Sequence, residues 1–108
     1  MSVDLLAGDD IRSISPDGFR ILLALAHSHG WKPAGTLPPP QWEEPGYVGP
    51  TWEGTYLTSD FQTIAPEDGA AIAAALERAA SSPEPLPASP RTLRGWAAFF
   101  RSGSVVIG

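Results

Sequence analysis

The amino-acid sequence predicts a small α+β domain in which three helices pack on a short, mainly antiparallel sheet. Three segments carry apolar residues at helical spacing, and each begins with a proline at its first position. Short β-prone segments bounded by glycine and turn-forming residues lie between and around them. A chain of 108 residues can bury one modest core, so we expect a single domain over residues 1–108.

The first helix is expected from about Pro16 to His29. Ser15 is a good N-cap residue, and proline suits the first helical position. Gly30 is expected to end the helix in a left-handed conformation. The i, i+3, i+4, i+7 spacing predicts a buried stripe of Phe19, Leu22, Leu23 and Ala26.

The second helix is expected from about Pro66 to Ser81. Glu67 and Asp68 fall in its first turn, where the helix dipole explains two carboxylates more simply than a paired catalytic site does. Ala65 stands where a capping Ser or Thr would be expected, a weakness of about 1 kcal/mol. The apolar face is marked by Ile72, Leu76 and Ala80.

The third helix follows a stiff, extended linker that runs from Ser82 to Ser89. Ser89 is its expected cap, Pro90 its first residue, and Gly103 its end. Its predicted core face consists of Leu93, Trp96, Ala97 and Phe100.

Four short strands are expected. Residues 54–57 and 61–64 are predicted to form a hairpin around the polar turn at 58–60. Residues 3–6 and 105–107 are candidates for the other two strands. We expect 105–107 to be an exposed edge strand, which would allow pairing with a second copy in a homodimer.

The composition excludes several classes of protein. The chain has no cysteine, so it forms no disulfide scaffold and has no thiolate metal site. Its net charge is −5 with seven basic residues, which argues against nucleic-acid binding. Neither a secretion signal nor a run of about 20 apolar residues is visible. We therefore expect a soluble cytoplasmic protein that binds neither nucleic acid nor membrane.

The arginines near the C-terminal end leave room for a locally basic surface in an otherwise acidic chain. They are Arg78, Arg91, Arg94 and Arg101. The acidic residues are dispersed apart from three adjacent pairs, which favours solubility and can steer a basic partner.

Three segments together resemble a group of small uncharacterised bacterial proteins. They read Gly-Trp-Lys-Pro-Ala-Gly-Thr at 30–36, Trp-Glu-Gly-Thr-Tyr at 52–56, and Ser-Asp-Phe-Gln-Thr-Ile at 59–64 before the Pro-Glu-Asp helix start. In that group a Gly-Trp-x-Pro-x-Gly-Thr segment follows the first helix, and an Asn-Asp-Gly-Gln-like turn precedes a helix opened by Glu-Asp. This chain departs from the pattern at Ser59 and Phe61, where Asn and Gly are favoured. The resemblance covers most of the chain and implies a shared fold without an established activity.

No catalytic or metal site is predicted. His27 and His29 are two residues apart on a helix and point to different faces, so they do not form a metal-binding pair. Asp60 lies at the expected hairpin tip among hydroxyl residues, where a general base is conceivable and an Asx-turn is the simpler explanation. The chain contains no nucleophile elbow, phosphate-binding loop or His-Glu-x-x-His motif. We accordingly expect no cofactor.

The loop between the first two helices is the predicted functional segment. Trp31 and Trp96 are expected in the core, whereas the tryptophans that lie among prolines are less easily buried. An exposed indole is a typical interface anchor. The predicted partner-binding residues are Trp42, Tyr47, Trp52, Glu53 and Asp60. The proline run at 38–40 is expected to act as a rigid spacer in this loop.

These observations lead to two hypotheses. The first is a non-enzymatic interaction or regulatory domain that binds another protein, by analogy with immunity proteins. The alternative is a small-molecule or glycan-binding domain, or a small hydrolase. It would use the same loop, with Trp52 as a stacking surface and Glu53 and Asp60 as the polar groups.

Overall fold

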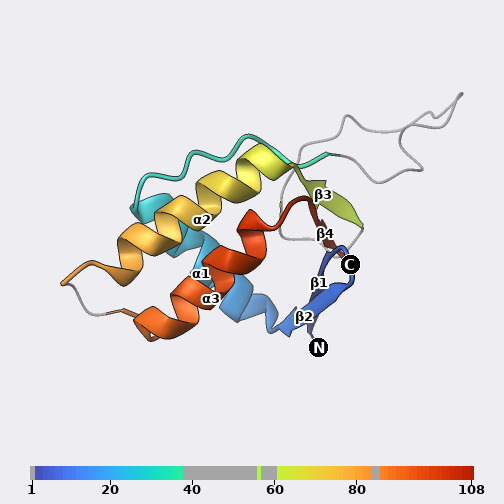
Figure 1. The fold of residues 1–108 in the computed structure, drawn as a ribbon. Coiled ribbons are helices and arrows are strands. Elements are labelled where there is room, and N and C mark those ends of the chain that lie inside the picture. The colour runs from blue at the N-terminus through green and yellow to red at the C-terminus, as the bar shows by residue number, and fades with distance from the viewer. Residues whose placement is uncertain (1, 38–55, 57–60, 84–85) are drawn as a thin grey trace, which may run out of the picture.

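The computed structural model describes residues 2–37, 56, 61–83 and 86–108. Within these ranges the three helices and the antiparallel four-stranded sheet of an α+β fold are present, as predicted (Figure 1). The elements in chain order are β1 Val3–Ala7, β2 Asp10–Ile14, α1 Pro16–Ser28, β3 Gln62–Ile64, α2 Pro66–Ala80, α3 Pro90–Arg101 and β4 Val105–Ile107.

The helix boundaries follow the predicted local signals. The Ser15 hydroxyl oxygen accepts from the backbone N–H of Gly18 at 2.9 Å, and Ser89 caps α3 in the same way. Helix α2 has no side-chain cap at Ala65, also as predicted. Gly30 has a φ of 103° directly after α1, which confirms its left-handed conformation. These signals act within one turn of chain, which is why the sequence reveals them.

The sheet differs from the prediction at three places. Its strand order is β2-β1-β4-β3, so β4 is a central strand and the prediction of an exposed edge at 105–107 is wrong. Strand β2, which the sequence analysis missed, pairs along its whole length with β1 through a tight turn. Of the predicted strand at 54–57 only Tyr56 is described, and its φ of 66° is that of a left-handed residue.

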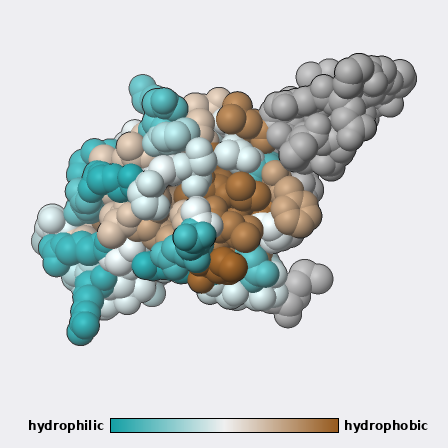
Figure 2. All heavy atoms as spheres, turned by 45° about the vertical axis from the view of Figure 1, so that its right-hand side comes forward, coloured by the Kyte–Doolittle hydropathy of each residue, from teal (hydrophilic) through white to brown (hydrophobic). Residues whose placement is uncertain are grey.

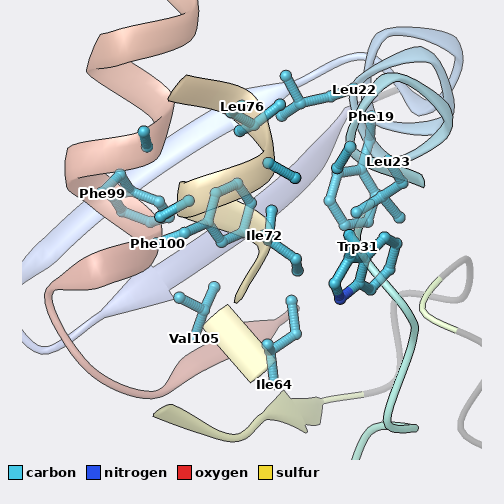
Figure 3. Close-up of a cluster of buried hydrophobic side chains, with 14 of the residues drawn as sticks. Phe19, Leu22, Leu23, Trp31, Ile64, Ile72, Leu76, Phe99, Phe100 and Val105 are labelled. Atoms are coloured by element: carbon cyan, nitrogen blue, oxygen red, sulfur yellow. The ribbon is translucent and has the colours of Figure 1, made fainter. Parts of the chain in front are cut away.

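The main core lies between one face of the sheet and the three helices. Helix α2 packs against both α1 and α3, and the side chains of all three helices meet above the sheet (Figures 1 and 3). Figure 3 shows Phe19 and Leu22 of α1 on one side of Ile72, with Phe100 of α3 on the other. The core residues with no exposed surface include Leu5, Ile64, Ile72, Leu76, Leu93, Phe100, Val105 and Ile107.

Helices α2 and α3 approach each other unusually closely at Gly69. A Cβ atom placed there would lie 2.7 Å from the backbone carbonyl oxygen of Phe100. Real Cβ atoms do not come so near a carbonyl oxygen, so only glycine fits this position. The alanines of α2 extend the same close packing.

One aromatic prediction for the core needs correction. Trp96 is only half-buried, whereas its neighbour Phe99, which was not predicted, is buried. The two rings meet edge to face, with centroids 5.7 Å apart. The guanidinium of Arg12 lies over both rings, at 5.6 Å from the centroid of Trp96 and 4.9 Å from that of Phe99. Trp96 is therefore covered partly by a cation from β2.

None of the helices formed by the described residues has the length and apolar character that a membrane span needs.

Candidate functional site

The predicted partner-binding residues lie outside the described part of the chain. They are Trp42, Tyr47, Trp52, Glu53 and Asp60. Their role as an interaction surface therefore stays a prediction. What the structure describes is the chain on either side of them, together with Tyr56.

A buried carboxylate organises the chain before this segment. Asp68, in the first turn of α2, is only 4% exposed. Its Oδ1 atom accepts from the indole Nε1–H of Trp31 at 2.9 Å and from the backbone N–H of Ala34 at 3.4 Å. Its Oδ2 atom accepts from the phenol of Tyr56 at 2.6 Å. Three donors and the positive end of the α2 dipole thus surround a carboxylate that has been removed from water.

A second set of hydrogen bonds continues from Tyr56. The phenol oxygen of Tyr56 accepts from the backbone N–H of Gly35 at 2.8 Å. The backbone N–H of Tyr56 donates at 3.0 Å to Oε1 of Gln62, a side chain with no exposed surface. The hydroxyl of Thr36 donates to the same Gln62 oxygen. We call these side chains, Trp31, Thr36, Tyr56, Gln62 and Asp68, the buried polar network.

All five side chains of the network are buried. Burial, together with the hydrogen bond to the Asp68 carboxylate, raises the pKa of Tyr56 far above its ordinary value. Tyr56 is also packed edge to face on Trp31, with ring centroids 5.3 Å apart. A phenol that is both buried and harder to ionise is a poor general base at neutral pH.

The network also explains the Gly-Trp-x-Pro-x-Gly-Thr segment in physical terms. Gly30 and Gly35 have positive φ, and between them the chain turns so that Trp31 reaches Asp68. The threonine that ends the segment reaches Gln62. The chain is thereby fixed at 31–36, at 56 and at 62, on both sides of residues 38–55. Helix-dipole reasoning alone missed this role of Asp68, because its partners lie 37 and 12 residues away in sequence.

The outer face of the sheet, which the helices leave uncovered, carries a row of mostly apolar side chains. The register pairs Ile11 with Leu6, Leu6 with Val106, and Val106 with Thr63, so these side chains lie side by side on one face. Leu37 extends the row, because it pairs with Thr63 through backbone hydrogen bonds of 2.7 and 3.0 Å. Ile11 is 61% and Leu37 51% exposed.

Phe61 adds the largest side chain to this face. It precedes β3, and its backbone N–H donates to the carbonyl of Ile107 at 2.8 Å. A Cβ atom placed on Gly108 would lie 3.0 Å from Leu6 Cδ1 and 3.5 Å from Phe61 Cε1, so both side chains border Gly108. We call Leu6, Ile11, Leu37, Phe61 and Val106 the outer-face patch. Figure 2, with the sheet side turned forward, shows hydrophobic side chains gathered there.

Phe61 is held in an unfavourable backbone conformation. Its φ is 65°, in the left-handed region that Gly and Asn adopt readily and bulky residues avoid. The ring is 60% exposed, so little packing offsets the cost. The stability of the domain therefore does not explain why an exposed aromatic residue stands at this position.

The charged groups beside the patch are mainly acidic. Asp4 lies on the same face next to Leu6 and accepts from the Ser13 hydroxyl at 2.7 Å. Asp9 lies in the turn between β1 and β2, two residues before Ile11. Among the described residues neither carboxylate has a cationic partner. Arg12, the nearest cation in sequence, points to the other face of the sheet, over Phe99 and Trp96.

The two histidines lie in the last turn of α1 and at its C-cap. His27 is exposed, and His29 is half-buried at the end of α1, where its carbonyl accepts from Arg78 Nε at 2.7 Å. Arg101 is paired with Glu77. Within the described ranges no three acidic, histidine or cysteine side chains come together as a metal site would require.

A second apolar area lies between α1 and α3. A hollow of about 200 Å³ is lined by side chains of both helices and by Pro87 and Ala88 before α3. Ile21 at its border is 51% exposed. Among the described lining residues, the polar side-chain groups are the hydroxyl of Thr92 and the indole N–H of Trp96, and the rest of the lining is apolar.

Searches of protein-family models, curated proteins and solved structures found no match to this chain. The resemblance described above therefore stays a prediction, and the proposals below depend on the geometry.

Proposed function

We propose that this chain is a non-enzymatic interaction domain that binds another protein through the outer face of its sheet. The observation that carries the proposal is Phe61, a large aromatic side chain that is 60% exposed and held at a φ of 65°. Its conformation costs about 1–2 kcal/mol relative to a residue that accepts positive φ. Aromatic residues are the most frequent anchors of protein interfaces, which gives a reason to keep one here.

The neighbours of Phe61 support the proposal. Monomeric proteins commonly expose single apolar residues, whereas here they line up across β2, β1 and β4 and continue beside β3 at Leu37 and Phe61. The face is also built on hydrogen-bonded strands, which hold its side chains in fixed positions. A rigid apolar surface loses little conformational entropy when a partner binds.

The predicted interaction loop is compatible with the same surface. The chain leaves the outer-face patch at Leu37 and re-enters it at Phe61, so residues 38–60 begin and end beside the patch. The buried polar network fixes the chain at 31–36 and 62. A rigid base is the usual setting for a binding loop. We therefore propose that the loop residues, Trp42 among them, contribute to the same interface.

The proposal can be tested by quantitative affinity capture from the native cell lysate with wild type and three variants. We expect a single stoichiometric protein to be recovered by wild type and by Ile21→Thr, which removes an equally exposed apolar residue from the α1–α3 hollow. Recovery should fall at least tenfold with Phe61→Asn, since interface anchors typically contribute 2 kcal/mol or more. Trp42→Ala tests the contribution of the loop.

Other outcomes would redirect the proposal. Equal recovery by wild type and Phe61→Asn would show that the outer-face patch is not the binding surface. Loss only with Ile21→Thr would assign binding to the hollow between α1 and α3. If no protein is recovered stoichiometrically, interaction with a protein is the wrong function, and a thermal-shift screen of sugars and nucleotides would test the small-molecule alternative.

A further inference from the structure

We propose that the partner of the outer-face patch is a polypeptide with an apolar strip that carries lysine or arginine side chains toward the β1–β2 side of the sheet. This inference rests on the proposed function and adds the chemistry and the orientation of the partner. It is drawn from the unequal distribution of charge and apolar surface across the four strands.

The row of apolar side chains across the sheet requires a matching apolar strip on the partner. The row runs from Ile11 on β2 through Leu6 and Val106 to Leu37 beyond β3. Four spacings of about 4.8 Å give it a length of about 19 Å. Phe61 stands near the β3 end of the face, so the deepest apolar pocket of the partner should meet this end.

The opposite side of the face carries carboxylates, which require cationic groups on the partner. Asp4, near the start of β1 beside Gly108, and Asp9, in the turn after β1, are both exposed on the β1–β2 side of the face, and neither has a cationic partner among the described residues. Asp10 is paired with Arg12, whose Nε lies 3.5 Å from the Asp10 carboxylate while the guanidinium carbon lies over the ring of Phe99 in α3. A partner that covers this side without bringing positive charge would remove two carboxylates from water at a cost. A partner with lysine or arginine at this side would compensate it.

The same charges argue against a second copy of this chain as the occupant. A symmetric pairing of two outer faces would place Asp4 and Asp9 of both copies in one interface. Like charges brought together in an interface are repulsive, and the described part of this face offers no cation to separate them. An acidic partner is disfavoured for the same reason.

The experiment is a selection of random 12-residue peptides from a displayed library on the immobilised full-length protein, followed by sequencing of the bound pool. We expect enriched peptides to combine apolar residues with at least a twofold excess of lysine and arginine over the input library. Binding of the enriched peptides should fall about tenfold on Asp4→Asn/Asp9→Asn and on Ile11→Thr/Val106→Thr. It should also weaken as NaCl is raised from 50 to 500 mM.

Matched variants separate specific from general electrostatic attraction. Asp17→Asn/Glu67→Gln removes the same number of exposed carboxylates from helix starts outside the sheet. It should leave binding of the enriched peptides within twofold of wild type. Asn at position 4 keeps an acceptor oxygen for Ser13, and Thr is well accepted in strands, so all variants are expected to fold. Their melting temperatures should confirm this.

The outcomes distinguish the inference from the proposed function. An apolar pool without basic bias, lost on Ile11→Thr/Val106→Thr and kept on Asp4→Asn/Asp9→Asn, would overturn the cationic chemistry and leave the binding face in place. Equal loss on the Asp17→Asn/Glu67→Gln control would also overturn it. No enrichment, or binding that ignores Ile11→Thr/Val106→Thr, would overturn both. A dimer in sedimentation experiments that Ile11→Thr/Val106→Thr dissociates would assign the face to a second copy instead.

Discussion

The two faces of the sheet differ in how far their side chains are exposed to solvent. On the face that the helices cover, Leu5 and Ile107 have no exposed surface, and even the amide of Gln62 is completely buried. On the outer face, Ile11 and Phe61 are more than half exposed. The covered side therefore contributes the stability of the domain, including that of its polar groups, whereas the open side is available for a partner.

This comparison gives an expectation for mutations. Changes on the covered side should lower the free energy of unfolding and leave the chemistry of binding alone. Changes on the outer face should weaken binding and leave the free energy of unfolding nearly unchanged. Four sets of variants test that division, in order of decreasing effect on stability.

Asp68→Ala is expected to have the largest effect on stability. It leaves the indole N–H of Trp31 and the phenol of Tyr56 without their acceptor inside the protein. Unsatisfied buried donors cost about 1–3 kcal/mol each, so we expect a loss of about 3 kcal/mol in urea unfolding. Glu67→Ala, in the same helix turn but exposed, should cost about 0.5 kcal/mol through the dipole. Equal effects of the two changes would contradict a structural role for the network.

Gly69→Ala tests how tightly the covered side is filled. The added methyl group would press on the carbonyl oxygen of Phe100, so we expect a loss of about 2 kcal/mol in thermal or urea unfolding. The matched change, Gly95→Ala in α3, meets no atom within 4 Å and should raise stability by about 1 kcal/mol through helix propensity. If Gly69→Ala were also stabilising, the close approach of α2 and α3 would be wrong.

Tyr56→Phe is expected to cost about 1.5 kcal/mol at pH 7, because it removes the donor to Asp68 and the acceptor for Gly35. The cost should shrink in alkali. The pKa of Tyr56 is raised in the fold, so above a pH of about 10 the unfolded chain releases a proton that the folded chain keeps. Stability of the wild type should then fall by about 1.4 kcal/mol per pH unit relative to the variant.

The measurement is urea unfolding of wild type and Tyr56→Phe between pH 8 and pH 11.5. Other titrating groups are shared by the two proteins, so the difference between them isolates Tyr56. If the difference in free energy of unfolding between wild type and Tyr56→Phe stayed constant with pH, the pKa of Tyr56 would not be raised in the folded protein.

Phe61→Asn should have the smallest effect on stability and a large effect on binding. Asn accepts the left-handed backbone and the ring makes little buried contact, so stability should stay equal or rise by up to about 1 kcal/mol. Phe61→Val, which is β-branched, should lower it by about 1 kcal/mol at the same site. A marked loss of stability with Phe61→Asn, measured by thermal unfolding, would show that Phe61 stabilises the domain as residues of the covered side do.

The division between the two faces also shows where sequence reasoning succeeds. The caps at Ser15 and Ser89, the stop at Gly30 and the stripe from Phe19 to Ala26 are local, and the structure confirms them. The position of β4 in the centre of the sheet and the pairing of β2 are not local. The sequence of such a short strand contains too little pattern to indicate which other strand it pairs with.

The same limit applies to the candidate site. The acidic pair at the start of α2 is visible in the sequence, but only one of its members is buried. Nothing within one helix turn tells Asp68 from Glu67, since their difference comes from Trp31 and Tyr56. Phe61 likewise reads as an ordinary strand residue until its φ and exposure are known. The predicted loop residues from Trp42 to Asp60 stay predictions.

The class of fold and the extents of the helices can be predicted from the amino-acid sequence, because propensity, capping and spacing act over a few neighbouring residues. The identity of the buried carboxylate, of the central strands and of the exposed apolar side chains could be learned from the folded structure alone. Those properties depend on contacts between residues far apart in the chain, and burial is defined by the whole packed molecule rather than by any segment of it.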